Sequence, residues 1–237
     1  MAHSSDFVHT RWSVGARAGS NDAKEASAAL SWLVDRYWDP LCRAAQRWGC
    51  TGHDAEDAVQ DFCYRLVERR IDLAQVTMNR GRFRSWLLVV FRNAVHDRHD
   101  AARALKRGGA AIMVDARLAD PTAPELSDLT FDRDWADNLL ARAADRLAGE
   151  QQSLAEQQRF SRLRPYLTAN ANSATYQQIC QALTCSEGAV KVALHRLRQR
   201  LRELARVEIR DTLVDPTQAD IDDELATLAK ALATESL

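Results

Sequence analysis

The stretch from Thr175 to Leu204, TYQQICQALTCSEGAVKVALHRLRQRLREL, decides the fold predicted for the second half of the chain. Thr175 and Gln178 have the spacing of a capping box at the start of a helix. A tight turn at 184–186 follows, and Ser186 is placed to cap a second helix. In that second helix the apolar residues repeat at a 3.6-residue period: Val190, Ala193, Leu194, Leu197, Leu201 and Leu204. The pattern predicts two helices joined by a turn, which is typical of a DNA-reading element.

The outer face of this second helix is predicted to be basic. Lys191, His195, Arg198 and Arg202 recur at spacings of four, three and four residues. On a helix these spacings place the side chains along one edge. We therefore expect a cationic stripe that faces solvent, opposite the apolar face.

The composition is that of a folded chain without a membrane span. Hydrophobic residues make up 46% of the 237 residues, yet no apolar run approaches the roughly 18 residues that a membrane helix needs. The start of the chain, MAHSSDFVHTRW, has no basic residues followed by an apolar stretch, so no secretory signal is expected. Five cysteines without a C-x-x-C pair argue against a disulfide framework and a zinc site. We expect a soluble cytoplasmic protein without a membrane partner.

Charge is spread unevenly along the chain. The net charge is −1 and the isoelectric point is near 6.6. Residues 82–107 nevertheless hold seven Arg or Lys against two Asp, whereas residues 208–237 hold eight acids against two basic residues. Screening limits charge effects to distances of roughly 8 Å, so these local fields decide what each surface attracts. The basic segment suits nucleic acid.

Helical periodicity recurs along the chain, and no alternating strand of useful length is present. The predicted fold class is therefore all-α. In the first half, the pattern predicts helices over 23–48, 54–69 and 82–105. Pro40 is expected either to kink the first of these helices or to divide it in two.

The domain organisation follows from where the periodicity weakens. Residues 110–131 contain Pro121, Pro124 and several short polar residues, which is typical of a linker. We therefore predict two helical domains joined by that linker, with an acidic extension after them: 1–109, 132–206 and 207–237. The apolar face that begins after Asp132 is expected to pack on the helix-turn-helix, since two short helices alone bury too little surface.

The helix predicted over 54–69 has two different faces. Thr51 with Asp54, or Asp54 with Asp57, has the spacing of an acidic capping box at its start. One face is apolar, and the opposite one is polar: Asp57, Gln60, Asp61, Tyr64 and Glu68. From the residues alone, a solvated face with acids near the helix N-terminus is the simpler interpretation. A surface for a partner is the alternative.

Four motifs in this order resemble bacterial RNA polymerase sigma factors of the extracytoplasmic-function (ECF) group. They are DAEDAVQDF (54–62), GRFRSWLLVVFRNAVHD (81–97), RFSRLRPYL (159–167) and SEGAVKVALHRLRQRLREL (186–204). The similarity spans Phe7 to Leu232 and looks like a long-chain subgroup with a C-terminal extension. Such a factor binds core RNA polymerase and directs promoter-specific transcription initiation; it is not an enzyme, and we expect no cofactor and no metal.

The resemblance also implies partners and contacts. The polar ridge would dock on the β′ clamp coiled coil of core RNA polymerase through Asp57, Gln60, Asp61 and Tyr64. The β flap of the polymerase is a further expected partner of the chain. An anti-sigma factor or other regulator is suggested by the family and by no residue of this chain. With a polymerase partner implied, docking becomes the preferred interpretation of the ridge.

Two sets of residues are expected to meet promoter DNA. The resemblance assigns the basic helix of the first domain to opened −10 DNA, where cations neutralise phosphates and asparagine or aromatic groups meet unstacked bases: Arg82, Arg84, Arg92, Asn93, Arg98, Arg103, Lys106 and Arg107. Trp86 lies on the apolar face, so core packing is expected for it. The first turns of the second-domain helix are expected to read the −35 element: Ser186, Glu187, Gly188, Ala189, Lys191, Val192, His195, Arg196 and Arg198. Arg198, Arg200 and Arg202 suit phosphate contacts or solvent better than base edges.

Two other classes of function are compatible with parts of the sequence. A helix-turn-helix regulator that is not a polymerase subunit is the first, but the acidic ridge before a basic helix favours the sigma interpretation. A metal-dependent hydrolase is the second, since three His-Asp dipeptides occur at 53–54, 96–97 and 99–100. The arginines around the last two pairs oppose a bound cation, which disfavours that alternative.

The acidic extension carries an amphipathic segment at 222–232, with Leu225, Leu228, Ala229 and Leu232 on one face. Its charge allows it to cover a basic DNA-binding face until polymerase binds. A terminal helix that completes the second domain is an equally good interpretation.

Overall fold

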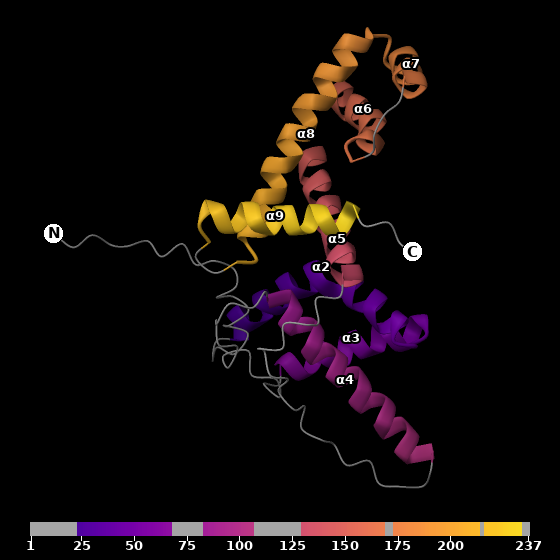
Figure 1. Cartoon of the computed structure of the whole chain (residues 1–237), viewed down its shortest axis with the longest axis vertical. Helices are drawn as coiled ribbons and strands as arrows, with labels where there is room; N and C mark the ends of the chain where they lie inside the picture. The colour runs from indigo at the N-terminus through magenta and orange to yellow at the C-terminus, as the bar shows by residue number, and fades with distance from the viewer. Residues whose placement is uncertain (1–22, 68–82, 107–128, 169–172, 214–215, 234–237) are drawn as a thin grey trace, which may run out of the picture. The chain divides into compact units, whose positions relative to one another are not determined.

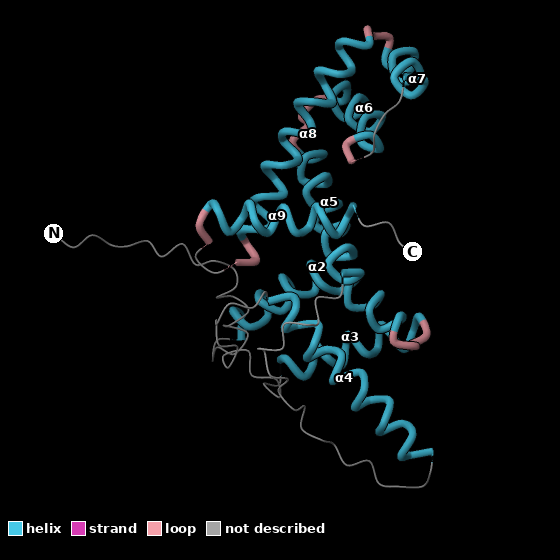
Figure 2. The backbone as a smooth tube through the Cα atoms, in the orientation of Figure 1, coloured by secondary structure: helices cyan, strands magenta, loops and turns pink. Residues whose placement is uncertain are grey.

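The computed structural model places most of the chain in helices (Figure 1). It describes residues 23–67, 83–106, 129–168, 173–213 and 216–233. Within these residues every regular secondary-structure element is a helix, and no strand is present (Figure 2). The predicted all-α fold is confirmed.

The chain divides into two compact units. Unit 1 is Met1–Asn138 together with Arg210–Leu237, and unit 2 is Leu139–Ile209. The sequence instead assigned everything between 132 and 206 to one second domain. The division falls inside two helices, α5 (Leu129–Gly149) and α8 (Glu187–Arg210).

Three helices form the centre of unit 1: α2 (Ala23–Arg47), α3 (Gly52–Val67) and α4 (Phe83–Lys106). Pro40 is buried inside α2, which is not divided there. The helix stops before Gly49, whose φ of +94° is a left-handed value that glycine adopts without strain. The helix therefore ends within one residue of the end predicted for it at 48.

The start of α3 uses the first of the two capping boxes that the sequence offered. The backbone N–H of Asp54 donates to the Thr51 hydroxyl oxygen at 3.4 Å, and that hydroxyl donates to the Asp54 carboxylate at 2.6 Å. The hydrogen bond from the Thr51 side chain lowers the pKa of Asp54. Because the helix begins at Gly52, the alternative box between Asp54 and Asp57 is not its start.

Aromatic and aliphatic side chains from α2, α3 and α4 fill the core of unit 1. Phe62 meets Phe91 edge-on at 5.2 Å between ring centroids, and Trp48 lies 5.8 Å from Phe91. The apolar faces predicted for these helices are buried, including Leu41, Val59, Leu66, Leu87, Val90 and Val95. Trp86 is 8% exposed and belongs to this core, as predicted.

The first half of α5 packs in unit 1, contrary to the prediction that this segment packs on the helix-turn-helix. Trp135 stacks on Tyr37 of α2 at 6.2 Å. Asp134 accepts hydrogen bonds from Arg43 at 3.1 Å and Arg47 at 2.6 Å. The periodicity of α5 identified its buried face but did not identify the unit against which each half packs.

The C-terminal segment also belongs to unit 1. Here α9 (Gln218–Ala233) begins at a capping box, in which the Asp220 N–H donates to the Thr217 hydroxyl at 3.2 Å and the Thr217 N–H donates to the Asp220 carboxylate at 2.8 Å. Its buried face is Ile221, Glu224, Leu228 and Ala231. The predicted face was displaced around the helix, since Ala229 is exposed. The contacts of this helix therefore group it with unit 1, whereas the sequence had offered it as a completion of the second domain.

Unit 2 contains the second half of α5, α6 (Leu154–Leu163), the short helix η2 (Arg164–Tyr166), α7 (Ser173–Leu183) and α8. A capping box between Ser153 and Glu156 opens α6. The prediction that Thr175 caps the next helix is wrong, because α7 already begins at Ser173. The buried side chains of this unit include Phe160, Leu163, Leu167, Ile179, Val190, Leu194, Leu201 and Leu204.

The turn between α7 and α8 is the one predicted. Helix α7 ends at Leu183, and Thr184 adopts a left-handed φ of +51°. The Cys185 N–H then reaches back to the Cys180 carbonyl oxygen at 3.2 Å, which is a Schellman ending. Ser186 caps α8, since its hydroxyl accepts from the Ala189 N–H at 3.3 Å.

Candidate functional site

Helix α3 presents the polar face that its sequence pattern predicted. Its buried side holds Ala58, Val59, Phe62 and Leu66, so the opposite side faces outward. On that side Asp57, Gln60 and Tyr64 are exposed and Asp61 is partly exposed, with Tyr64 at 56%. We call these four residues the α3 ridge.

The acids of the α3 ridge already have basic neighbours. Asp61 pairs with Arg65, one turn later on the helix, at 2.8 Å. Asp57 lies 3.6 Å from the guanidinium of Arg98 on α4. Both pairs are partly exposed to water, where an ion pair contributes about 1 kcal/mol or less. A charged partner could therefore exchange with them at little cost.

Helix α4 carries the basic residues expected at −10 DNA, and they differ in exposure. Arg92 and Asn93 are half-buried, and the Arg92 guanidinium lies 5.8 Å from the centre of the Trp48 ring. Arg98 is half-buried and paired with Asp57. Asn93 lies on the side of α4 opposite Phe91, whereas Arg98 continues the stripe of Leu87 and Phe91 beyond the core and meets α3.

Arg84 is a correction to the predicted −10 set. It is 4% exposed and pairs with Asp132 of α5 at 2.5 Å and with Glu224 of α9. Its guanidinium also lies over the Trp135 ring at 4.9 Å. A side chain enclosed in this way is not available to DNA, because contact would require these ion pairs to open.

The other members of the −10 set are not described. Arg82 and Arg107 lie outside the described residues. Arg103 and Lys106 lie within α4, but their side chains are outside the described part of the structure. Their contacts with −10 DNA stay predictions.

The start of α8 brings most of the −35 set onto one accessible surface. The exposed members are Ser186, Glu187, Gly188, Lys191, Val192, His195 and Arg196, and Ala189 is half-buried. Val192 is a large apolar side chain that is 51% exposed. In the first turns of a major-groove helix, such a side chain can contact the methyl group of thymine.

Lys191 is held by two neighbours within unit 2. Its ammonium group lies 2.6 Å from the Glu187 carboxylate and 5.3 Å from the centre of the Tyr176 ring. The hydrogen bond to Glu187 raises the pKa of Lys191. Glu187 and Lys191 were both predicted to contact DNA, and their mutual ion pair would have to rearrange for both to do so.

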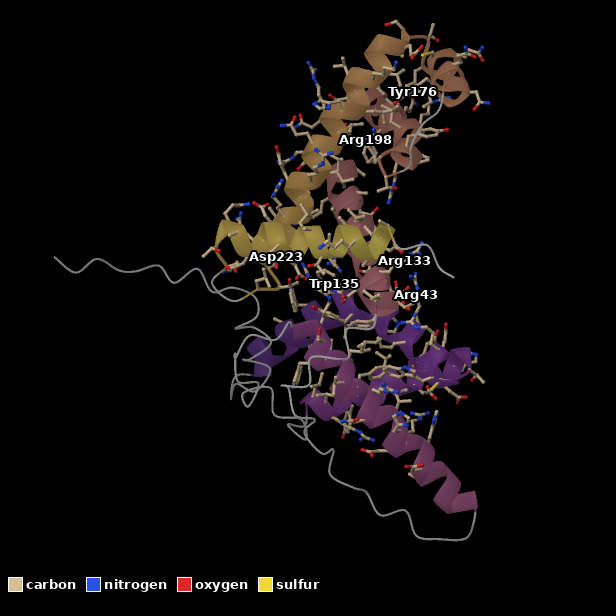
Figure 3. All side chains as sticks on the ribbon, in the orientation of Figure 1. Arg43, Arg133, Trp135, Tyr176, Arg198 and Asp223 are labelled. Atoms are coloured by element: carbon tan, nitrogen blue, oxygen red, sulfur yellow. The ribbon has the colours of Figure 1, made fainter. Side chains whose placement is uncertain are left out.

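Arg198 is a second correction. The stripe was predicted to face solvent along its length, but Arg198 is half-buried and donates to the carbonyls of Tyr166 at 2.7 Å and Leu167 at 3.2 Å. Figure 3 labels it on α8. Carbonyls at the end of a helical turn lack partners within the helix, so Arg198 fastens η2 to α8.

The sequence analysis missed the buried acids that pair with arginines. Glu208 of α8 pairs with Arg142 at 3.0 Å and Arg146 at 2.8 Å within unit 2. Asp132 and Glu224 do the same for Arg84 in unit 1. The available signal was an acid within an apolar helical face, as Glu224 is between Ile221 and Leu228.

The histidine and cysteine side chains do not assemble a metal site in the part of the chain that the structure describes, where no group of three or more possible ligands is found. His53 is fully exposed at the start of α3, whereas His99 lies 3.5 Å from the sulfur of Cys50. His99 is also close enough to Asp54 to help lower the pKa of its carboxyl, although the hydrogen bond from the Thr51 side chain is the largest cause.

The comparison with known families covers the segment that holds α3 and α4. Residues 33–104 match Sigma-70 region 2. The matched region contains the whole α3 ridge and the described −10 candidates, and it supports a sigma factor role in RNA polymerase binding and promoter melting. No curated protein and no solved structure gives a significant match to the chain. Among the described helices, none has the length and apolar character needed to cross a membrane.

Proposed function

We propose that the chain is a sigma factor of the ECF group, which binds core RNA polymerase and directs promoter-specific initiation. The observation that carries the proposal is the match of residues 33–104 to Sigma-70 region 2. In this proposal the first domain binds polymerase and the −10 element, and the α7–α8 pair binds the −35 element.

The α3 ridge supports the polymerase contact. It combines two acids, an amide and the exposed Tyr64 ring on one side of a helix whose other side is core. Tyrosine at the centre of such a surface supplies contact area, while acids select a basic partner. A basic helical surface on polymerase, such as the β′ clamp coiled coil, fits this chemistry.

The two basic helices support the DNA contacts. Arg92, Asn93 and Arg98 combine phosphate-binding groups with an amide that can hydrogen-bond a base. On α8, Lys191 and Arg196 can meet phosphate or guanine, and Glu187 can accept a hydrogen bond from cytosine. These groups lie within the first turns of a capped helix, as in major-groove readers.

The deciding experiment is reconstitution with core RNA polymerase. The full chain should co-elute with the core enzyme, and the complex should make transcripts that start at defined promoters. If the chain does not form this complex but binds specific DNA sequences by itself, a helix-turn-helix regulator is favoured instead. Sequencing the transcripts of the complex would identify the −35 and −10 elements.

Asp61→Arg should weaken binding to core polymerase by at least about tenfold, because it places a like charge against a basic partner. Binding is measured by titrating labelled polymerase with the variant. The matched control is Glu56→Arg, the same charge change on the same helix at an exposed position off the α3 ridge. Equal losses in the two variants would exclude the α3 ridge as the docking surface.

Arg196→Ala should lower the affinity of the polymerase complex for its promoter by about tenfold, the usual effect of losing one good base contact. Arg196 is exposed and makes no hydrogen bond or ion pair within the described residues, so its loss should leave α8 intact. Arg202→Ala, exposed and further along α8, is the control. On a promoter with a scrambled −35 element, Arg196→Ala should have no further effect; an identical loss there would assign Arg196 to phosphate.

A further inference from the structure

Two arginines within the segment that matches Sigma-70 region 2 have acidic partners outside it. Arg36 of α2 lies 4.0 Å from Asp211, and Arg84 of α4 pairs with Asp132 of α5 and Glu224 of α9. Both arginine side chains are less than a tenth exposed. Since an unpaired charge is very costly to bury, this region depends on residues that lie beyond it in the chain.

Glu224 is built into the buried face of α9. It lies between Ile221 and Leu228, and its side chain is 6% exposed. The hydrogen bonds between Thr217 and Asp220 fix the start of the helix. Glu224 then lies one turn after Asp220, in the turn that meets α4. Charged side chains are almost never buried unless they are paired, so this turn of α9 is specific for a cation.

The Arg84 guanidinium is enclosed by groups from two other helices. Asp132 and Glu224 accept its hydrogen bonds, and the Trp135 ring lies 4.9 Å from it. Figure 3 labels Trp135, which in turn stacks on Tyr37. The remaining nitrogen, Nη2, is buried without a hydrogen-bond partner in the described structure, so the two carboxylates are its principal compensation.

Arg84 lies in the first turn of α4, the same helix that carries Arg92 and Asn93. At about 1.5 Å per residue, these two side chains are roughly 12 Å further along the axis. Buried ion pairs often add little stability over apolar residues, but they can fix the register between elements. Here the pair between Arg84 and Glu224 fixes the start of α4 relative to α9.

We propose that Glu224 is a positioning residue for promoter opening: through Arg84, the C-terminal helix holds α4 in the orientation in which Arg92 and Asn93 meet the −10 strand. This inference rests on the proposed function. It assigns the C-terminal helix a part in the melting step, although that helix lies outside the segment matched to Sigma-70 region 2.

The test compares Glu224→Gln with wild type in the polymerase complex. Glutamine keeps the shape and a hydrogen-bond acceptor but removes the charge. On a duplex promoter, the rate of opening, read from a fluorescent base in the −10 element, should fall by about tenfold, as expected when a buried charge loses one of two partners. On a promoter with a pre-opened −10 region the variant should initiate within about twofold of wild type, and its binding to core polymerase should be unchanged.

The matched control is Asp223→Asn, which makes the same charge change at the adjacent, exposed position of α9 (Figure 3). It should open the duplex promoter at the wild-type rate. Glu224→Asp restores the carboxylate on a side chain one methylene shorter, so it should recover part of the opening rate lost in Glu224→Gln and should still open the duplex promoter more slowly than wild type.

Two results would overturn the proposal: an unchanged opening rate in Glu224→Gln, or an equal loss on duplex and pre-opened templates. If Glu224→Gln has less helix than wild type by circular dichroism, Glu224→Asp is tested in its place. A folded Glu224→Asp variant that opens the duplex promoter slowly but initiates normally on the pre-opened one supports positioning. A wild-type opening rate on the duplex promoter opposes it. If the wild-type chain itself fails to bind polymerase, the proposed function fails instead.

Discussion

Replacing Trp135 by alanine should lower the free energy of unfolding of unit 1 by about 3–5 kcal/mol, the usual cost of removing a buried tryptophan. Trp135 is 1% exposed, stacks on Tyr37 and lies under the Arg84 guanidinium. The substitution therefore removes an aromatic pair and a cation–π contact as well as buried area. Urea unfolding followed by circular dichroism gives the total loss, and hydrogen exchange of α2 and α5 amides assigns it to unit 1.

Two control variants show whether that loss comes from the buried ring of Trp135. Trp135→Phe should cost clearly less than alanine, because a ring remains to stack and the buried indole Nε1 has no hydrogen-bond partner in the described structure to lose. Leu129→Ala, at a 59% exposed position of the same helix, should change the free energy by no more than about 0.5 kcal/mol. Equal losses for Leu129→Ala and Trp135→Ala would show that α5 does not pack through Trp135.

The local structure could be predicted where the pattern depends on neighbours in the chain. The apolar repeat of α8 identified its buried side, and the short polar residues Thr51 and Ser186 identified two helix starts. A capping hydrogen bond links residues three positions apart, so its signal lies entirely within the sequence. The same rule failed at Thr175, because α7 begins earlier, at Ser173.

The partners of α5 and α9 could not be predicted in this way. An apolar repeat shows which side of a helix is buried but not which other helix packs against that side. The repeat around Trp135 therefore did not distinguish packing on α2 from packing on α8. In α9, the buried carboxylate of Glu224 pairs with Arg84, which is 140 positions away in the chain. Long-range charge pairing leaves no local periodicity from which it could be inferred.

The candidate site was predictable in its outline but not for each arginine. The α3 ridge and the start of α8 lie on accessible surfaces, as their helical spacing indicated. Arg84 and Arg198 have the same charge as their neighbours, yet one is enclosed by carboxylates and the other holds carbonyls of η2. Basic residues near a DNA-binding motif therefore include some whose partner is the protein itself.

Arg84→Met should destabilise unit 1 by about 3–5 kcal/mol, because it removes the guanidinium that pairs with the buried carboxylates of Asp132 and Glu224. The lost area is small, since methionine fills much of the space of the arginine stem. Arg92→Met is the matched control on the same helix. Its side chain is half-buried and its described contact is the Trp48 ring, so its loss should be about 1 kcal/mol or less. Both free energies come from urea unfolding at neutral pH.

A second substitution separates the charge from the packing. If the damage in Arg84→Met arises from buried carboxylates that have lost this guanidinium, adding Glu224→Gln removes one of these charges, and the double variant should be more stable than Arg84→Met alone. The double-mutant cycle should then give a coupling of about 1 kcal/mol or more between Arg84 and Glu224. Additive losses would mean that the two side chains do not act as a pair. The C-terminal helix would then be attached to unit 1 by its apolar contacts alone, and it could not control the start of α4 through charge.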